Sequence, residues 1–86
     1  MYEYLIGEYV KNLTLVDILN YARKENININ NLDANTLLYY IKYHYSELIS
    51  DDYQNILKEI KKKIDPTTYS EVYKLYVLYR NRYLTK

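Results

Sequence analysis

The feature that most limits how this chain can fold is its lack of residues that form tight turns. Glycine and proline occur once each among the 86 residues, as Gly7 and Pro66. A β-protein needs turn residues about every 8–12 positions, and this chain cannot supply them. Apolar residues recur instead at the spacing of amphipathic helices. We therefore predict an all-α fold, a compact single-domain bundle of four to five helices over residues 1–86.

Five segments carry the helical pattern, and we place their bounds from the apolar stripe and from capping residues. They cover about residues 2–12, 14–26, 31–49, 50–64 and 65–83. The last segment is apolar around much of its circumference. Such a helix is either the central helix of a bundle or one that binds a partner.

Capping signals predict three of the helix starts. Thr14 is followed three residues later by Asp17, which is the form of a capping box. Ser50 is a candidate cap for the fourth segment. Asp65 before Pro66 is the combination of a cap and a first-turn proline for the fifth, and Thr68 is an alternative cap there.

Between the second and third segments, residues 26–31 alternate asparagine with isoleucine. Asparagine side chains compete for backbone hydrogen bonds and resist helix formation. We predict a short extended connector with Ile27 and Ile29 turned inward. Residues 14–45 would then form a helix–extended loop–helix unit.

Several classes of function find no support in the composition. The chain has no cysteine, which excludes disulfides and thiolate metal sites and favours the interior of a cell. Its beginning lacks the basic start and long apolar run of a secretory leader, and no stretch is apolar enough to span a membrane. No nucleotide, metal or cofactor motif is present, so we expect no cofactor, no metal, no membrane partner and no small-molecule substrate.

His44 and the pair Asp51–Asp52 are the candidates for catalysis or cation binding. His44 is the single histidine and shares a face with Ile41 and Leu37, so we interpret it as a core or rim histidine rather than a general base. Asp51 and Asp52 are explained by a position at a helix N-terminus, because adjacent helical residues point about 100° apart and do not easily share a cation. We therefore predict that the protein is not an enzyme.

The charges are distributed unevenly along the chain. Residues 1–57 carry 4 basic and 8 acidic groups, whereas residues 58–86 carry 8 basic and 3 acidic groups. Lysines at a helix C-terminus complement its dipole, but the same cations could contact phosphates. An alternative hypothesis is therefore a nucleic-acid-binding module that uses Lys58, Lys61, Lys62, Lys63, Arg80 and Arg82.

Tyrosine is the most unusual component, with 14 residues, while phenylalanine and tryptophan are absent. Tyrosine is enriched at protein interfaces because it offers a large contact area with few rotatable bonds. It also serves as a core residue with its hydroxyl at the rim. The tyrosines that we predict to contact a protein partner are Tyr39, Tyr43, Tyr73, Tyr76 and Tyr79.

Two resemblances bear on the fold. The pattern Leu15-x-x-Ile18-Leu19-x-Tyr21-Ala22, Ile27-x-Ile29 and Asp65-Pro66-x-Thr68 resembles the YqfT-like family of small Bacillales proteins over about residues 13–80. That resemblance implies a cytoplasmic, all-helical bacterial protein, with no known activity and no site residues. Residues 14–45 also resemble SAP or LEM units, which often bind DNA or DNA-associated proteins.

The leading interpretation is a non-enzymatic helical module in the cytoplasm that binds a protein, including a second copy of itself, through tyrosine-rich helical surface. The SAP and LEM resemblance supports the shape of the unit more than a DNA-binding role. Its basic residues are few, namely Arg23, Lys24 and Lys42.

Overall fold

The computed structural model describes the backbone of residues 2–83 and the side chains of residues 7–82. Five helices follow one another along the described chain: α1 (Tyr2–Lys11), α2 (Leu15–Lys24), α3 (Asn31–Ile49), α4 (Tyr53–Lys61) and α5 (Pro66–Tyr83). No strand is present in residues 2–83. The prediction of a small all-α bundle is confirmed.

Two of the predicted caps form as expected. The Thr14 hydroxyl accepts a hydrogen bond from the Asp17 amide at 3.3 Å, and the Asp17 carboxylate accepts one from the Thr14 amide at 3.0 Å. At the start of α5, the Asp65 carboxylate accepts hydrogen bonds from the amides of Thr67 and Thr68. Both helices therefore begin where side-chain oxygens satisfy amides that have no partner within the helix.

The predicted start of the fourth helix was wrong. Ser50 ends α3 instead, with its hydroxyl donating to the Glu47 carbonyl at 2.8 Å. Helix α4 begins three residues later and has no side-chain cap. Thr68 is likewise not a cap. Its buried hydroxyl donates to the Asn28 carbonyl at 3.4 Å and so makes a contact with a distant segment.

The connector after α2 begins with a turn at Asn26 and has no helix or strand over residues 27–30, where Asn30 is extended. Asn26 has φ of 60°, the left-handed conformation that commonly ends a helix. The Ile27 amide donates to the Ala22 carbonyl and the Asn26 amide donates to the Arg23 carbonyl, as in a Schellman motif. Ile27 and Ile29 are half-buried.

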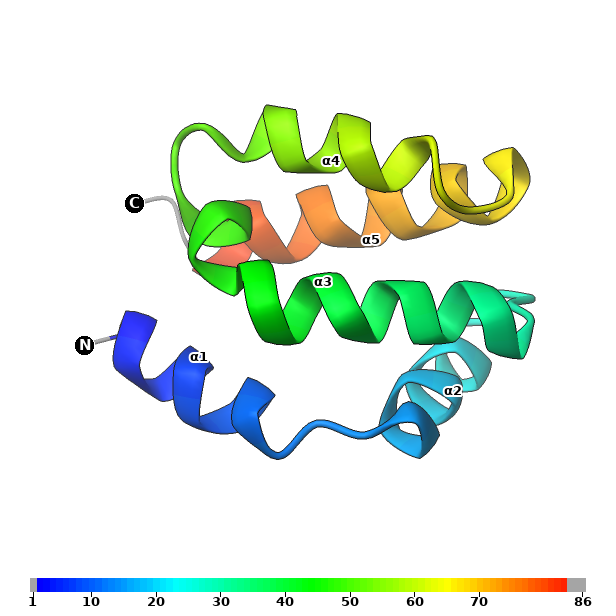
Figure 1. Ribbon diagram of the computed structural model, residues 1–86, viewed down its shortest axis with the longest axis horizontal. Helices are drawn as coiled ribbons and strands as arrows, with labels where there is room; N and C mark the ends of the chain where they lie inside the picture. The colour runs from blue at the N-terminus through cyan, green and yellow to red at the C-terminus, as the bar shows by residue number, and fades with distance from the viewer. Residues whose placement is uncertain (1, 84–86) are drawn as a thin grey trace.

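Helix α3 lies at the centre of the molecule (Figure 1). It packs against α1 and α2 on one side and α4 on the other, and α5 packs against α4. The central role expected as one option for residues 65–83 therefore belongs to α3. The main core is shared by α3, α4 and the turn after α4, and consists of Leu37, Tyr40, Leu48, Ile56, Leu57, Ile60 and Ile64.

Polar side chains join distant segments at the end of the molecule that holds the connector and the turn between α4 and α5. Asp33 is buried in the first turn of α3, and its carboxylate accepts a hydrogen bond from the Asp65 amide at 3.1 Å. Together with the Thr68–Asn28 hydrogen bond, this contact ties the connector and α3 to the start of α5.

Helix α1 approaches α3 closely at the one glycine. A Cβ atom added at Gly7 would lie 2.7 Å from the Tyr45 hydroxyl oxygen. Because real Cβ contacts are essentially never that short, Gly7 allows α1 to rest against the Tyr45 ring in its present position. The glycine that lowers the helix propensity of this segment therefore has a packing role.

Candidate functional site

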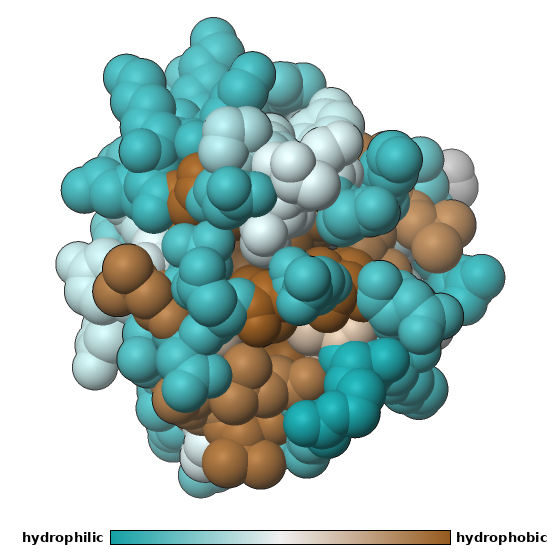
Figure 2. Space-filling model, turned by 90° about the vertical axis from the view of Figure 1, so that its right-hand side faces the viewer, coloured by the Kyte–Doolittle hydropathy of each residue, from teal (hydrophilic) through white to brown (hydrophobic). Residues whose placement is uncertain are grey.

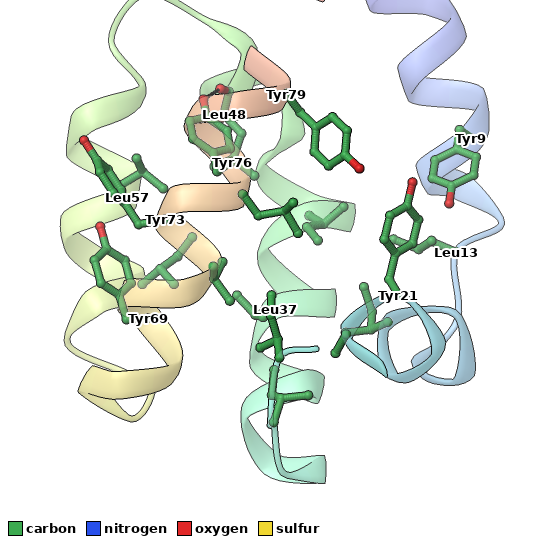
Figure 3. A pocket seen from close by; sticks show the side chains of 18 residues that line it. Tyr9, Leu13, Tyr21, Leu37, Leu48, Leu57, Tyr69, Tyr73, Tyr76 and Tyr79 are labelled. Carbon is green, nitrogen blue, oxygen red and sulfur yellow. Dashed lines mark hydrogen bonds between the residues drawn. The ribbon is translucent and has the colours of Figure 1, made fainter. Parts of the chain in front are cut away.

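An apolar groove lies between the α1–α2 side of the molecule and α5, with α3 at its base. Its volume is about 310 Å³. Figure 3 shows side chains from several helices pointing into this space. Every described residue that lines the groove is aliphatic, alanine or tyrosine, so tyrosine hydroxyls are the polar side-chain groups among them.

The groove has a buried base and two partly exposed walls. Leu37 and Leu48 of α3 are buried at the base, while Ile18 of α2 and Leu75 of α5 are half-buried on opposite walls. Figure 2 views the right-hand end of the molecule in Figure 1, where α2 and the connector lie, and shows hydrophobic side chains grouped among hydrophilic ones. Apolar surface therefore remains accessible beside the core.

Three tyrosines from three different helices stand at one side of the groove. Tyr9 of α1, Tyr21 of α2 and Tyr79 of α5 direct their hydroxyls toward one region (Figure 3). The Tyr79 hydroxyl donates to the Glu25 carboxylate at 3.3 Å. The arrangement gives an apolar groove a polar edge made of phenols and a carboxylate.

The surroundings of these phenols favour their neutral form. Desolvation by burial raises the pKa of Tyr9, with smaller contributions from Tyr21 and Asp17. Desolvation also raises the pKa of Tyr79, and the nearby Glu25 carboxylate raises it further. Both hydroxyls therefore keep their protons at neutral pH and can donate hydrogen bonds.

The other predicted tyrosines of α5 have different environments. Tyr76 donates a hydrogen bond from its hydroxyl to the Leu48 carbonyl, and its ring lies 5.6 Å from the Tyr53 ring. Tyr73 is 36% exposed, and its ring lies 5.9 Å from that of Tyr69. Tyr76 is therefore mainly a packing residue, whereas Tyr73 lies at an accessible edge of the groove.

The remaining two predicted tyrosines lie away from the groove, on an exposed face of α3. Leu32 is 75% exposed, Tyr39 53% and Tyr43 70%. The rings of Tyr39 and Tyr43 are 5.2 Å apart, and Tyr39 also meets the buried Tyr40 edge to face at 5.3 Å. The five predicted tyrosines are thus divided between two regions.

A second hollow runs beside this face, between α3 and α4, with a volume of about 480 Å³. Leu32 and Tyr39 line it on the α3 side, and Glu59 and Lys63 line it on the α4 side. The Tyr40 hydroxyl donates to the Glu59 carboxylate at 3.1 Å, and burial with this partner raises the pKa of Tyr40. The hollow therefore combines an aromatic wall with a charged one.

His44 occupies an irregular position in α3. Its backbone (φ −133°, ψ 23°) departs from helical values, and the helix is kinked there. Its Nδ1 lies 2.6 Å from a Glu47 carboxylate oxygen, and its ring lies 5.4 Å from the Tyr40 ring. This environment is that of a histidine at the edge of the core.

Among the described residues, there is no cluster for metal binding and no unsatisfied buried side-chain polar group. No group of three or more histidine, cysteine, aspartate or glutamate residues that could hold a metal occurs in the described part of the chain. Within the same part, every buried side-chain nitrogen and oxygen has a hydrogen-bond partner. No described helix is long and apolar enough to cross a membrane.

The six predicted basic residues do not form one surface. Arg80 is only 9% exposed: its guanidinium donates to the Leu48 carbonyl and the Tyr76 hydroxyl, both at 3.2 Å, and lies 4.0 Å from the centre of the Tyr53 ring. Arg80 is therefore a structural residue, which argues against its predicted part in nucleic-acid binding. Figure 1 shows that α4 and α5 run in opposite directions, so the last turn of α5, which carries Arg80 and Arg82, lies at the other end of the molecule from the last turn of α4, which carries Lys61.

Sequence reasoning did not single out Tyr9 and Tyr21 as site residues. Tyr21 belongs to the same helix as the apolar stripe residue Ile18, and nothing in its local pattern indicates that it faces Tyr79. The sequence feature that could have indicated the groove is the alternation at Ile27 and Ile29, which places two apolar residues next to α2.

Comparison with models of known protein families gives a match over residues 1–79, to the family described as "Protein of unknown function (DUF2624)". No curated protein matches the chain. No solved structure matches it either.

Proposed function

The chain belongs to the DUF2624 family, whose function is not established, and we propose that it is a non-enzymatic protein-interaction module. Its contact surface is the exposed face of α3 with the adjacent hollow between α3 and α4. The partner is a protein that presents a helix, and a second copy of the chain is one such partner.

The observation that carries this proposal is an exposed stripe along α3. Leu32, Thr36, Tyr39 and Tyr43 follow one another at intervals of four, three and four residues. These intervals place them along one face of the helix, in the spacing by which helices pack against each other. Three of the four are large hydrophobic side chains at least half exposed, although the usual place for such a stripe is against another helix.

The chemistry of the stripe also fits a protein interface. Tyrosine rings give a large apolar contact area and keep a hydroxyl for hydrogen bonding. The Thr36 hydroxyl donates to the Leu32 carbonyl at 3.1 Å, so its methyl group can remain on the contact surface. Glu59 and Lys63 on the other side of the hollow offer charges of both signs to the flanks of a docked helix.

Photo-crosslinking in the producing cells tests the proposal. A photoreactive phenylalanine derivative replaces Tyr43, and the matched control places it at Val16, which is 62% exposed on α2. We expect a discrete covalent adduct from position 43, with the crosslinked segment of the partner mapping to a helix. Leu32→Ala should weaken the adduct. No adduct beyond that at position 16 would contradict the proposal.

The proposal places the protein in the bacterial cytoplasm and retains its likeness to the YqfT-like proteins of Bacillales. Nucleic-acid binding, the alternative, is left with Lys58, Lys61, Lys62 and Lys63 as exposed neighbouring cations. Titration with duplex and single-stranded DNA at two salt concentrations distinguishes the two, since phosphate contacts weaken steeply with salt.

A further inference from the structure

The groove between α2 and α5 carries a second inference, independent of the α3 face. We infer that this groove binds a small amphiphile: a molecule with an apolar chain of roughly ten to twelve carbon atoms and an uncharged hydrogen-bonding head. The apolar chain occupies the space above α3, and the head lies beside the hydroxyls of Tyr9, Tyr21 and Tyr79.

The volume of the groove suits a small molecule. An apolar cavity of about 150 Å³ holds one benzene molecule, so 310 Å³ suits a chain about twice as large. It is also within the range of small-molecule sites, which starts at about 300 Å³.

The lining of the groove indicates that the bound molecule has an apolar chain. The walls offer aliphatic carbons from Ile18, Ile41, Val72 and Leu75, all half-buried and thus accessible from the groove. No charged side chain is among the described residues that line it. An apolar chain loses no hydrogen bonds on entering such a space, whereas a polar chain would.

The polar edge of the groove indicates which head group the bound molecule has. Phenol hydroxyls both donate and accept hydrogen bonds, so three of them suit an alcohol or an amide. Asp17 lies near enough to Tyr9, and Glu25 to Tyr79, to raise the pKa of those phenols. Two carboxylates near the head site oppose an anionic head, and the cation Arg82 lies near Tyr79 and acts in the opposite direction.

Titration of the full chain with decan-1-ol, followed by calorimetry and by methyl NMR shifts, tests the inference. We expect saturable one-to-one binding with the largest shifts at Ile18, Ile41 and Leu75. Lengthening the alcohol from hexanol should tighten binding about fourfold per methylene until the groove is full. Decanoate at neutral pH should bind about tenfold more weakly than decanol.

Paired variants locate the site. Leu75→Trp fills the groove and should abolish saturable binding, whereas Leu78→Trp, on the same helix at a 53% exposed position outside the groove, should not affect it. Tyr21→Phe removes one head-site hydroxyl and should weaken decanol binding about fivefold, with Tyr43→Phe as the control. If circular dichroism shows that Leu75→Trp does not fold, Ile18→Trp fills the groove from the opposite wall.

Four results would overturn the inference: no saturation by decanol, binding that survives both tryptophan variants, equal or tighter binding of decanoate, or self-association in sedimentation that is lost with Leu75→Trp. The last result would make a second copy the occupant. None of these results depends on Tyr39 or Tyr43, so the inference and the proposed function can fail separately.

Discussion

The two tyrosine-lined regions of this molecule use the same side chain in opposite ways. Beside the groove, Tyr76 is half-buried and donates a hydrogen bond to the Leu48 carbonyl, and the hydroxyl of Tyr79 donates to the Glu25 carboxylate. On the outer face of α3, Tyr39 and Tyr43 contact each other and remain more than half exposed. The difference shows that enrichment in tyrosine is not itself a site, because the position of each ring relative to its helix decides between packing and contact.

The largest effect that separates the two regions is on folding stability. Tyr76→Ala removes a ring packed on Tyr53 and a hydroxyl bonded to the Leu48 carbonyl, and should lower the free energy of unfolding by about 3 kcal/mol. Tyr43→Ala should change it by less than about 0.5 kcal/mol. Urea unfolding followed by circular dichroism measures both, and equal losses would break the comparison.

The two arginines of α5 provide a second comparison between a buried and an exposed side chain. Arg80→Met deprives the Leu48 carbonyl and the Tyr76 hydroxyl of a charged donor and should cost about 2 kcal/mol of unfolding free energy. Arg82 is exposed, so Arg82→Met should stay within about 0.5 kcal/mol. A similar small effect for both variants, measured by urea unfolding, would show that Arg80 is not a structural residue.

A smaller effect on stability is expected at Gly7, where α1 packs against Tyr45 of α3. In a helix, alanine is favoured over glycine by about 1 kcal/mol, but the new Cβ atom would meet the Tyr45 hydroxyl. Gly7→Ala should therefore stabilise the protein little in the natural sequence and by up to about 1 kcal/mol when Tyr45→Phe has removed that hydroxyl. Thermal unfolding of the four variants of this cycle provides the measurement, and additive effects would argue against the contact.

The smallest effect appears only at alkaline pH. Burial raises the pKa of Tyr9, Tyr69, Tyr76 and Tyr79 beside the groove above the ordinary value of 10.0. The unfolded chain then loses these protons at lower pH than the folded chain, so the unfolding free energy should fall as pH rises above about 10. Urea unfolding from pH 8 to 11 tests the sign, and stability that is constant or rises would contradict it.

Local signals predict most of the helical framework. Thr14 with Asp17, and Asp65 with Pro66, place two helix starts because their hydrogen bonds are made within a few residues. The prediction at Ser50 was wrong because a serine hydroxyl can cap the end of one helix as well as the start of the next. Such ambiguity is decided by packing, which the local pattern does not contain.

The site is less accessible to sequence reasoning because it depends on residues distant in the chain. Tyr9, Tyr21 and Tyr79 come together only once α1, α2 and α5 are placed around α3 (Figure 3). Arg80 is buried for the same reason, since its partner carbonyl is 32 residues away. By contrast, the exposure of Tyr39 and Tyr43 follows from one helix and its periodicity, so it could be predicted.

The hydrogen bond between the Asp33 carboxylate and the Asp65 amide has a consequence for biosynthesis. Helices α1 to α3 are synthesised before residue 65, so the Asp33 carboxylate lacks its hydrogen bond from the Asp65 amide during that stage of translation. Until α5 follows, the groove has one wall and its isoleucines face water. A nascent chain that has not yet made α5 therefore exposes apolar surface that a chaperone can recognise.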